Sequence, residues 1–220
     1  MYMIIVGAGS IGTSLIDIAT QDKNNVVVVE TNAKRAKELS NKYDITVLNA
    51  NATLAETLRE AGSDRADALI TTTGDDAVNL MVVSIAERLK IPSIVAVVND
   101  PEHAEFFRKL GANVLENPED VVANHLYTAV RQPKLKDYTI LPQGEQVFRI
   151  AVNKGSPLIG HSLSESTERG ILPKTVSVAA VERDGKKEIT TGDTIINAED
   201  VLTLFALERV NDEQVDKLTG

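Results

Sequence analysis

The chain has 220 residues, of which 43% are hydrophobic and 25% are charged, and it contains no Cys and no Trp. This composition is typical of globular proteins, and it excludes collagen, a disulfide scaffold and a wholly disordered chain. Without Cys, thiol catalysis, iron–sulfur ligation and Cys-type zinc sites are also excluded. The net charge is −9 and no stripe of Lys and Arg is present, so we expect no nucleic acid among its partners.

The apolar stretches are too short to span a bilayer. Met3–Val6 and Val26–Val29 are among the longest, whereas a membrane helix requires about 20 residues. The first residues lead directly into a predicted strand, without the basic region and cleavage site of a signal peptide. We therefore expect a cytoplasmic protein whose mature form begins near Met1. Its acidity argues against direct attachment to an anionic membrane but leaves docking onto a membrane protein open.

Short β-branched runs alternate with stretches of helical periodicity from residue 1 to about residue 130. Both faces of these runs are mostly apolar, as expected for a parallel sheet that is covered by helices on both sides. The predicted strands are residues 2–6, 26–29, 45–48, 68–72, 94–98 and 113–115. Six βα units in a row predict an α/β fold, a Rossmann-type doubly wound parallel sheet with strand order 3-2-1-4-5-6.

The pattern changes at a basic, Pro-containing linker, residues 131–137. Beyond it, a second, smaller α+β domain of four strands is predicted, with Asp184-Gly185 as a hairpin turn. Its expected elements are strands at 147–152, 176–183, 187–190 and 201–207, and a helix at 162–168. From Asn211 onward we expect a frayed tail or a short helix. The predicted domains are thus residues 1–130 and 138–220.

A glycine-rich motif joins the first predicted strand to the first predicted helix. It reads Gly7-Ala8-Gly9-Ser10-Ile11-Gly12, which fits the pattern G-x-G-x-x-G. In this pattern the first glycine permits a tight turn, the second lets a pyrophosphate approach the backbone, and the third lets helix and strand pack closely. The helix N-terminus then offers unpaired N–H groups and a partial positive charge to phosphates. The motif therefore predicts a phosphate-binding loop.

An acidic residue supports this interpretation. Glu30 ends the second predicted strand, 18 residues after Gly12. A carboxylate there accepts hydrogen bonds from ribose hydroxyls and repels a 2′-phosphate, so the pocket should favour NAD or an adenosine nucleotide over NADP. Arg35, one turn into the following helix, could reach the adenosine side of the ligand. It is a lesser candidate, because a basic residue at such a position is more often solvated.

The carboxyl ends of later strands line the same crevice in such a fold. Asn51 could bond an adenine edge, and Thr73-Gly74 could pass under the phosphates. The predicted contact residues at these ends are Asn51, Ala52, Thr73, Gly74 and Val98. Asp75 is expected to cap a helix rather than to join Asp76 in a metal site.

No catalytic pattern accompanies the loop. His103, His125 and His161 are scattered, and the sequence contains no G-x-S-x-G, no H-E-x-x-H and no Walker A lysine. A dehydrogenase needs a group that moves the proton accompanying the hydride. We therefore expect a protein that is not an enzyme, in which the nucleotide is an effector.

Further motifs characterise the chain more specifically than the glycine loop does. In the first domain they are Met3–Gly12, Val29-Glu30, Asn51-Ala52-Thr53, Leu58–Gly62, Ala66-Asp67-Ala68, Thr73–Leu80, Asn99–His103, Leu110-Gly111-Ala112 and Glu116–Glu119. In the second they are Gly155–Leu163 and Gly192–Ile195. With these motifs the chain, from about residue 1 to 208, resembles TrkA-type potassium-uptake regulators. Those proteins join an RCK domain (regulator of conductance of potassium) to an RCK/TrkA-C domain.

The resemblance implies a cytosolic, non-catalytic subunit at the inner face of a Trk/Ktr-like potassium transporter. Such subunits form homo-oligomers, from dimers to rings that often hold eight RCK units. NAD or NADH, ATP or ADP binds the crevice and changes the geometry of the ring, which gates ion flow. The implied contact positions are Gly7–Ile11, Glu30, Asn51, Ala52, Thr73, Gly74 and the end of strand five.

Three departures from the family pattern bear on the ligand. Members commonly carry Gly-Asp where this chain has Ala50-Asn51, which changes the adenine contact. They often have Arg or Lys near Val97, and its absence is expected to weaken ATP relative to other ligands. Their acidic ribose residue is often Asp, and Glu30 is one methylene longer.

Three alternatives stay open. An NAD-dependent oxidoreductase would show hydride transfer, and a gating ring of a potassium channel would belong to a pore subunit rather than to a transporter. In the third, the C-terminal domain senses its own ligand, such as a small anion or a cyclic dinucleotide.

Overall fold

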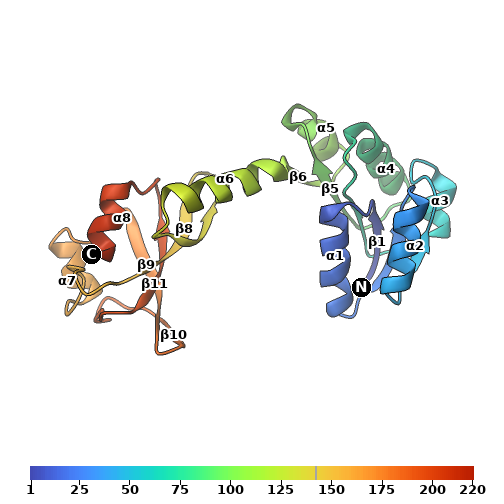
Figure 1. Cartoon of the computed structure of the whole chain (residues 1–220). Coiled ribbons are helices and arrows are strands. Elements are labelled where there is room, and N and C mark those ends of the chain that lie inside the picture. The colour runs from blue at the N-terminus through green and yellow to red at the C-terminus, as the bar shows by residue number, and fades with distance from the viewer. Residues whose placement is uncertain (142) are drawn as a thin grey trace. The chain divides into compact units, whose positions relative to one another are not determined.

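The computed structural model describes residues 1–141 and 143–220, and it divides into two compact units, Met1–Asp120 and Val121–Gly220 (Figure 1). Each unit has one sheet and a hydrophobic core of its own. Within the described ranges, no helix is both long and apolar enough to cross a membrane.

The first unit is built on a parallel sheet of six strands. They are β1 (Tyr2–Val6), β2 (Asn25–Val29), β3 (Thr46–Leu48), β4 (Ala68–Thr71), β5 (Ser93–Val98) and β6 (Asn113–Glu116). Their order in the sheet is β3-β2-β1-β4-β5-β6, and every neighbouring pair is parallel. This confirms the predicted doubly wound topology. The order reverses between β1 and β4, where such sheets open a crevice at the carboxyl ends of their strands.

Helices cover both faces of this sheet. They are α1 (Ser10–Gln21), α2 (Ala33–Lys42), α3 (Ala55–Glu60), α4 (Asp76–Arg88) and α5 (Ala104–Lys109), with a short 3₁₀ turn, η1 (Pro101–His103), before α5. Successive strand residues point to opposite faces. Ile5 accordingly packs with Ile16 of α1 in one core layer, and Ile4 packs with Val82 of α4 in the other, all fully buried.

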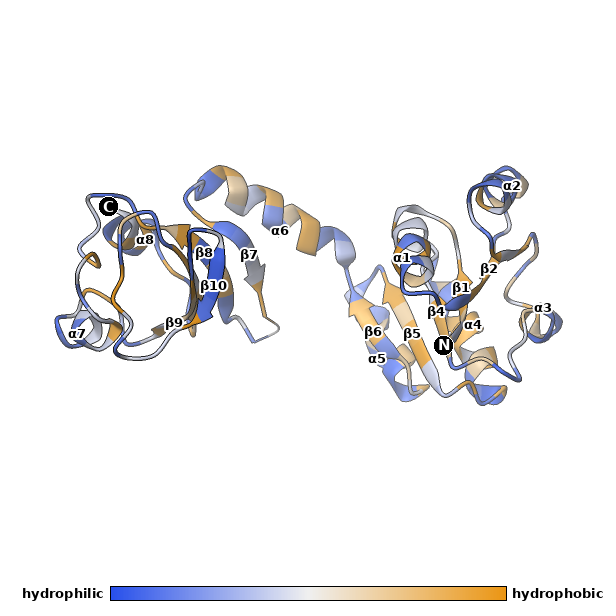
Figure 2. Cartoon of the chain, turned by 90° about the horizontal axis from the view of Figure 1, so that it is seen from below, coloured by the Kyte–Doolittle hydropathy of each residue, from blue (hydrophilic) through white to orange (hydrophobic). Residues whose placement is uncertain are grey.

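The second unit contains an antiparallel sheet of five strands. They are β7 (Lys136–Ile140), β8 (Gln146–Ala151), β9 (Val176–Arg183), β10 (Lys186–Ile189) and β11 (Val201–Ala206), in the order β10-β9-β11-β8-β7. Two helices, α7 (Leu163–Glu168) and α8 (Asp212–Thr219), belong to this unit. Phe148, Ile150, Leu202 and Leu204 alternate with half-buried residues and are fully buried in its core. The edge strand β10 is hydrophilic, as its blue colour in Figure 2 shows.

One sequence-based expectation for this part of the chain needs correction. The sheet has five strands instead of four, because β7 begins inside the predicted linker, residues 131–137. Only Tyr138 of β7 is buried, so no hydrophobic alternation reveals the strand. Helix α6 (Pro118–Arg131) also runs across the division near Asp120, which lies before the predicted domain boundary at residue 130. The residues after Asn211 form α8, which confirms the short helix that was one of the two expected outcomes. A capping box begins this helix, and Val215 is buried in it.

Candidate functional site

Two positions of the glycine loop between β1 and α1 accept only glycine. Gly7 has a φ of +90°, in the left-handed region that other residues rarely adopt. A Cβ on Gly12 would lie 2.1 Å from the carbonyl oxygen of Gly7, so the helix can approach the turn only without a side chain there. A Cβ on Gly9 would meet no protein atom within 4 Å, and its backbone is therefore open to an approaching group.

The N-terminus of α1 is left without a side-chain cap. Gly9 occupies the N-cap position, and the first turn contains no acidic residue. The first N–H groups of a helix have no partner within it, and they carry partial positive charge. This end of α1 is therefore suited to an anion such as a phosphate.

Glu30 follows β2 directly and turns its carboxylate back toward the loop. Its Oε2 accepts a hydrogen bond from the Ala8 N–H at 2.7 Å, and its Oε1 accepts one from the Asn32 N–H at 2.7 Å. The residue is only 6% exposed, and no described Lys, Arg or His lies within ion-pairing distance. The carboxylate is thus held in one orientation, and its remaining lone pairs can accept hydrogen bonds from ligand hydroxyls.

Two asparagines shape the wall beside Glu30. Asn49, after β3, donates its Nδ2 to the carbonyl oxygens of Glu30 and Thr31, each at 2.9 Å. Asn51 accepts from the N–H and the hydroxyl of Thr53 at 2.9 and 2.8 Å, which folds the chain into a tight turn. The position of Asn51 at the crevice is as predicted, whereas the role of Asn49 carried no sequence signal beyond its place after a strand.

The opposite wall is the turn from β4 into α4. Asp75 caps α4, because its Oδ1 accepts from the N–H groups of Ala77 and Val78. This confirms the predicted capping role. Asn79, fully buried in α4, accepts from and donates to Thr73 in the same turn. Sequence reasoning missed this asparagine because its partners are fixed only by the fold.

These walls enclose a cleft of about 530 Å³, within the range of small-ligand sites. Its lining includes most of the predicted contact residues, namely Gly7, Ala8, Gly9, Glu30, Asn51, Ala52, Thr73 and Gly74. Ser10 and Ile11 line other hollows beside α1, and Gly12 is buried beneath the loop. Val98 was predicted to be a contact, but it is fully buried in the core and does not line the cleft. No described residue of β5, or of the segment directly after it, is among those that line the cleft.

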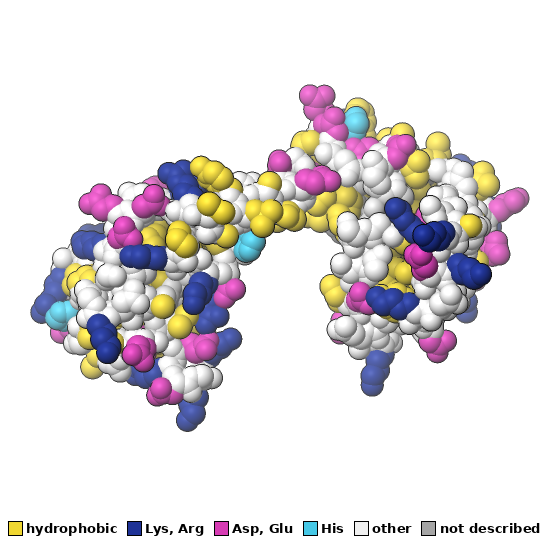
Figure 3. All heavy atoms as spheres, viewed as in Figure 1, with side chains coloured by type: hydrophobic (Ala, Val, Ile, Leu, Met, Phe, Trp, Pro, Cys, Tyr) yellow, Lys and Arg dark blue, Asp and Glu magenta, His cyan; other side chains and the backbone are white. Residues whose placement is uncertain are grey.

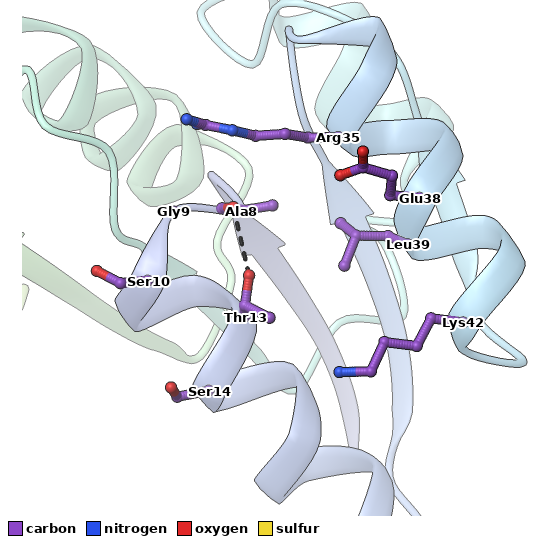
Figure 4. Close-up of a pocket in the computed structure, with 9 residues that line it drawn as sticks. All are labelled: Ala8, Gly9, Ser10, Thr13, Ser14, Arg35, Glu38, Leu39 and Lys42. Carbon is purple, nitrogen blue, oxygen red and sulfur yellow. Dashed lines mark hydrogen bonds between the residues drawn. The ribbon is translucent and has the colours of Figure 1, made fainter.

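A second hollow, of about 560 Å³, lies between α1 and α2, beside the cleft. Figure 4 shows Arg35 extending from α2 toward the loop residues Ala8 and Gly9, with Thr13 bonded to the Ala8 carbonyl oxygen. Arg35 is exposed, as predicted, but it lines both the hollow and the cleft. Lys42, farther along α2, is engaged with Asp17 at 3.5 Å. Arg35 is thus the cation that, among the described residues, lines both the hollow and the cleft.

An acidic residue and a histidine meet behind the Thr73 turn. Asp76 accepts hydrogen bonds from the N–H groups of Asn99 and Asp100 and from Nδ1 of His103, at 2.8–2.9 Å. Burial alone would raise the pKa of Asp76, but these bonds outweigh it and lower the pKa to about 2. The pKa of His103 is raised, chiefly by its bond to Asp76. His103 therefore has a specific partner that the sequence did not predict.

The other titratable candidates do not join the cleft. His125 lies near the carbonyl oxygen of Tyr138, and His161 lies beside Arg169 and Glu165 in the second unit. In the described part of the chain, no group of three or more His, Asp or Glu side chains is arranged to hold a metal ion.

The second unit has a smaller hollow of about 290 Å³ over its sheet. Its charged lining is largely paired, since Arg149 contacts Asp137 at 3.0 Å and Glu182 at 2.5 Å. These contacts do not identify a ligand for the C-terminal unit, and the predicted alternative of a separate sensor site stays a prediction.

Comparisons with known proteins agree with this architecture. Residues 3–118 match the TrkA-N domain and residues 147–210 match the TrkA-C domain. The Trk system potassium uptake protein TrkA of Vibrio alginolyticus is 32% identical over 215 residues, which cover 94% of this chain and 46% of that protein. A TrkA homolog of the same system in Pyrococcus abyssi is 29% identical over 215 residues, covering 94% of this chain and 92% of that protein.

This chain therefore spans about half the length of the Vibrio relative. Among solved structures, a GsuK channel bound to NAD is similar over 100% of this chain and 39% of that chain, with a TM-score of 0.64. The sequences are 24% identical, and a likeness at this level shows the fold alone.

Proposed function

Because the chain belongs to the family that joins a TrkA-N domain to a TrkA-C domain, we propose that it is a nucleotide-binding regulatory subunit of potassium transport. In this proposal it works in the cytoplasm, at the inner face of a membrane-embedded potassium transporter. NAD or NADH, or alternatively ATP or ADP, binds the cleft of the first unit and alters the activity of that transporter. The protein itself is not an enzyme.

The observation that carries the proposal is the pairing of an uncapped helix end with a buried carboxylate. The N-terminus of α1 offers unpaired N–H groups to a phosphate, and Glu30 offers acceptor lone pairs to a ribose on the neighbouring strand. A buried anion without a cationic partner is costly unless its hydrogen-bonding capacity is used. A ribose with two hydroxyls supplies the missing donors, and a 2′-phosphate would be repelled.

Regulation would follow from differential binding. A nucleotide shifts an equilibrium between two arrangements of the protein only if it binds one of them more tightly. A tenfold preference corresponds to about 1.4 kcal/mol per site, and several coupled sites multiply the bias. Flux of potassium through vesicles that contain the transporter, measured with the regulator and saturating NADH or ATP, tests this step. An unchanged flux with every nucleotide would contradict the regulatory role.

The binding step is tested by following the melting temperature with NAD, NADH, ATP, ADP and NADPH. A ligand at 100 times its Kd stabilises the folded state by about 2.7 kcal/mol. We expect stabilisation by at least one of the first four nucleotides and a smaller effect of NADPH. No stabilisation by any nucleotide, or a preference for NADPH, would refute the proposal.

The role of Glu30 has a matched test in the same unit. Glu30→Gln replaces one carboxylate oxygen by an N–H donor, which can no longer accept from Ala8 or from the ribose. We expect binding to weaken by about tenfold or more, since a charged hydrogen bond contributes about 1.5–3 kcal/mol. Glu38→Gln is the control, because Glu38 lines the neighbouring hollow and not the cleft. Equal losses in both variants would exclude a specific ribose contact.

Assembly with further copies of the chain is supported by helix α6. Its large apolar side chains are exposed, with Val130 at 84%, and Figure 3 shows them as yellow spheres along the helix. They are Val121, Val122, Leu126, Tyr127 and Val130. Contiguous exposed apolar surface marks an interaction site. We expect a homo-oligomer in native mass spectrometry and dissociation by Leu126→Glu. A monomeric wild-type chain at micromolar concentration would contradict assembly.

Two alternatives are separated by direct measurement. The likeness to the GsuK channel is one of fold alone, and a gating ring of a channel would be indicated by co-purification of a pore subunit. An oxidoreductase would oxidise NADH in the presence of carbonyl substrates. None of the described residues lining the cleft is His, Lys or Tyr, the usual groups for the accompanying proton transfer.

A further inference from the structure

Asn79 is the most completely bonded polar side chain next to the cleft. It lies in the first turns of α4 and is fully buried. Its Oδ1 accepts from the Thr71 hydroxyl at 2.5 Å, the Thr73 hydroxyl at 2.7 Å and the Thr73 N–H at 3.2 Å. Its Nδ2 donates to the carbonyl oxygens of Thr73 at 2.9 Å and Val97 at 3.0 Å. One amide thus joins the ends of β4 and β5 to α4.

Most of these hydrogen bonds join Asn79 to Thr73, which lines the cleft together with Gly74 and Asp75. Asn79 holds the N–H, the carbonyl and the hydroxyl of Thr73 at once. The Nδ2 of Asn99 adds a longer bond to the same Thr73 carbonyl at 3.3 Å. A buried amide that loses its partners costs free energy, so the turn is kept in the one shape that satisfies Asn79.

The place of Thr73 in the sheet shows which part of a ligand this wall would meet. A doubly wound sheet consists of two mononucleotide-binding halves, and a dinucleotide lies across the crevice between them. The glycine loop and Glu30 belong to the half formed by β1, β2 and β3. Thr73 follows β4 and belongs to the other half. A mononucleotide can therefore take its main contacts from the loop and Glu30, and it depends less on the Thr73 wall, the turn from Thr72 to Asp75 that lines the same cleft.

We propose that Asn79 is a positioning residue that fixes the Thr73 wall for the second nucleotide of a dinucleotide. It acts through Thr73, since it does not itself line the cleft. The inference rests on the proposed function and deepens it. Asn79 distinguishes a dinucleotide such as NADH from a mononucleotide such as AMP, whereas the loop and Glu30 serve both.

The test compares two probes, NADH and AMP, by calorimetric titration of the full-length chain. Asn79→Asp keeps the shape of the side chain but places an oxygen against the carbonyl oxygens of Thr73 and Val97. The lost donor and the repulsion should move the turn. We expect the affinity for NADH to fall by about tenfold and that for AMP to change by less than about twofold.

Two further variants keep the test decisive if Asn79→Asp folds poorly. Thr71→Val removes one hydroxyl that anchors Asn79, lies outside the cleft, and should weaken NADH by about threefold. Val83→Ala, at a fully buried position of the same helix, lowers stability without touching Thr73. It should lower the melting temperature and leave both affinities unchanged.

Each result has a defined meaning. If NADH and AMP weaken equally in Asn79→Asp and Thr71→Val, or if neither weakens, Asn79 has no positioning role. A similar loss of NADH selectivity in Val83→Ala would assign the effect to general destabilisation and would also refute the inference. Wild-type protein that binds neither probe nor any other nucleotide would refute the proposed function itself, and the inference would fall with it.

Discussion

Replacing Asp76 by Asn removes a carboxylate that joins the start of α4 to the segment after β5. In the wild type, the carboxylate accepts from the N–H groups of Asn99 and Asp100 and from His103. An amide of the same shape can keep the bonds at one oxygen, but its nitrogen would face the Asp100 N–H and the imidazole. The substitution therefore leaves donors without an acceptor at a site where the Asp76 side chain is only 10% exposed.

The size and the pH dependence of the effect follow from the pKa of Asp76. Folding lowers this pKa from 3.8 to about 2, which corresponds to about 2 kcal/mol of folding free energy at neutral pH. Because the folded-state pKa is the lower one, this stability is present above pH 4 and is lost as the pH falls toward 2. The pKa of His103 is raised, so its contribution is present at mildly acidic pH and declines as the pH rises through that pKa.

Hydrogen exchange with mass spectrometry is the suitable assay, because each unit has a hydrophobic core of its own and exchange is read for each segment. We expect faster exchange of the Asn99 and Asp100 amides in Asp76→Asn at pH 7, and a lower melting temperature of the first unit. Asp75→Asn is the control, since Asn caps a helix nearly as well as Asp. The reasoning would be refuted if Asp76→Asn had wild-type stability at pH 7. It would also be refuted if the deficit persisted unchanged at pH 2.

Three further predictions concern single side chains. Gly12→Ala should abolish nucleotide binding in titrations, because its Cβ would lie 2.1 Å from the Gly7 carbonyl oxygen; retained affinity would contradict so close an approach of helix and turn. Ser166→Ala should raise the free energy of unfolding in urea by about 1 kcal/mol, since the buried Ser166 hydroxyl has no partner among the described residues; a loss of stability would reveal one. Arg183→Ala should lower the stability of the second unit by about 2 kcal/mol in calorimetry, because buried Asp200 loses two bonds of 2.8 Å; an unchanged melting temperature would show the pair to be dispensable.

The sheet of the first unit was predictable because its signals are local. Most of its strands are short runs that are apolar on both faces, and the handedness of βα units leaves few possible strand orders. The glycine loop and Glu30 could be placed for the same reason, since both lie at the ends of recognisable strands. Strand β7 could not, because only Tyr138 among its five residues is buried and no alternation distinguishes it from a linker.

The polar contacts behind the cleft could not be predicted from any local pattern in the sequence. Asp76 and His103 are 27 residues apart in the sequence and meet only because α4 and η1 follow neighbouring strands. Val98 shows the converse, since its position at the end of a strand suggested a contact but the fold buries it completely. Proximity across the sheet decides such roles, and no local pattern in a single sequence reports it.

By itself, the sequence determined the alternation of strands and helices, the phosphate loop and the acidic residue beside it, because backbone propensity and hydrophobic period act over a few neighbouring residues. Only the tertiary structure decided which polar side chains support the loop, that Asn79 and Asp76 brace the opposite wall, and that Glu30 is buried against Ala8. Hydrogen bonds of this kind require atoms within about 3 Å, and that condition is met only after distant segments have packed.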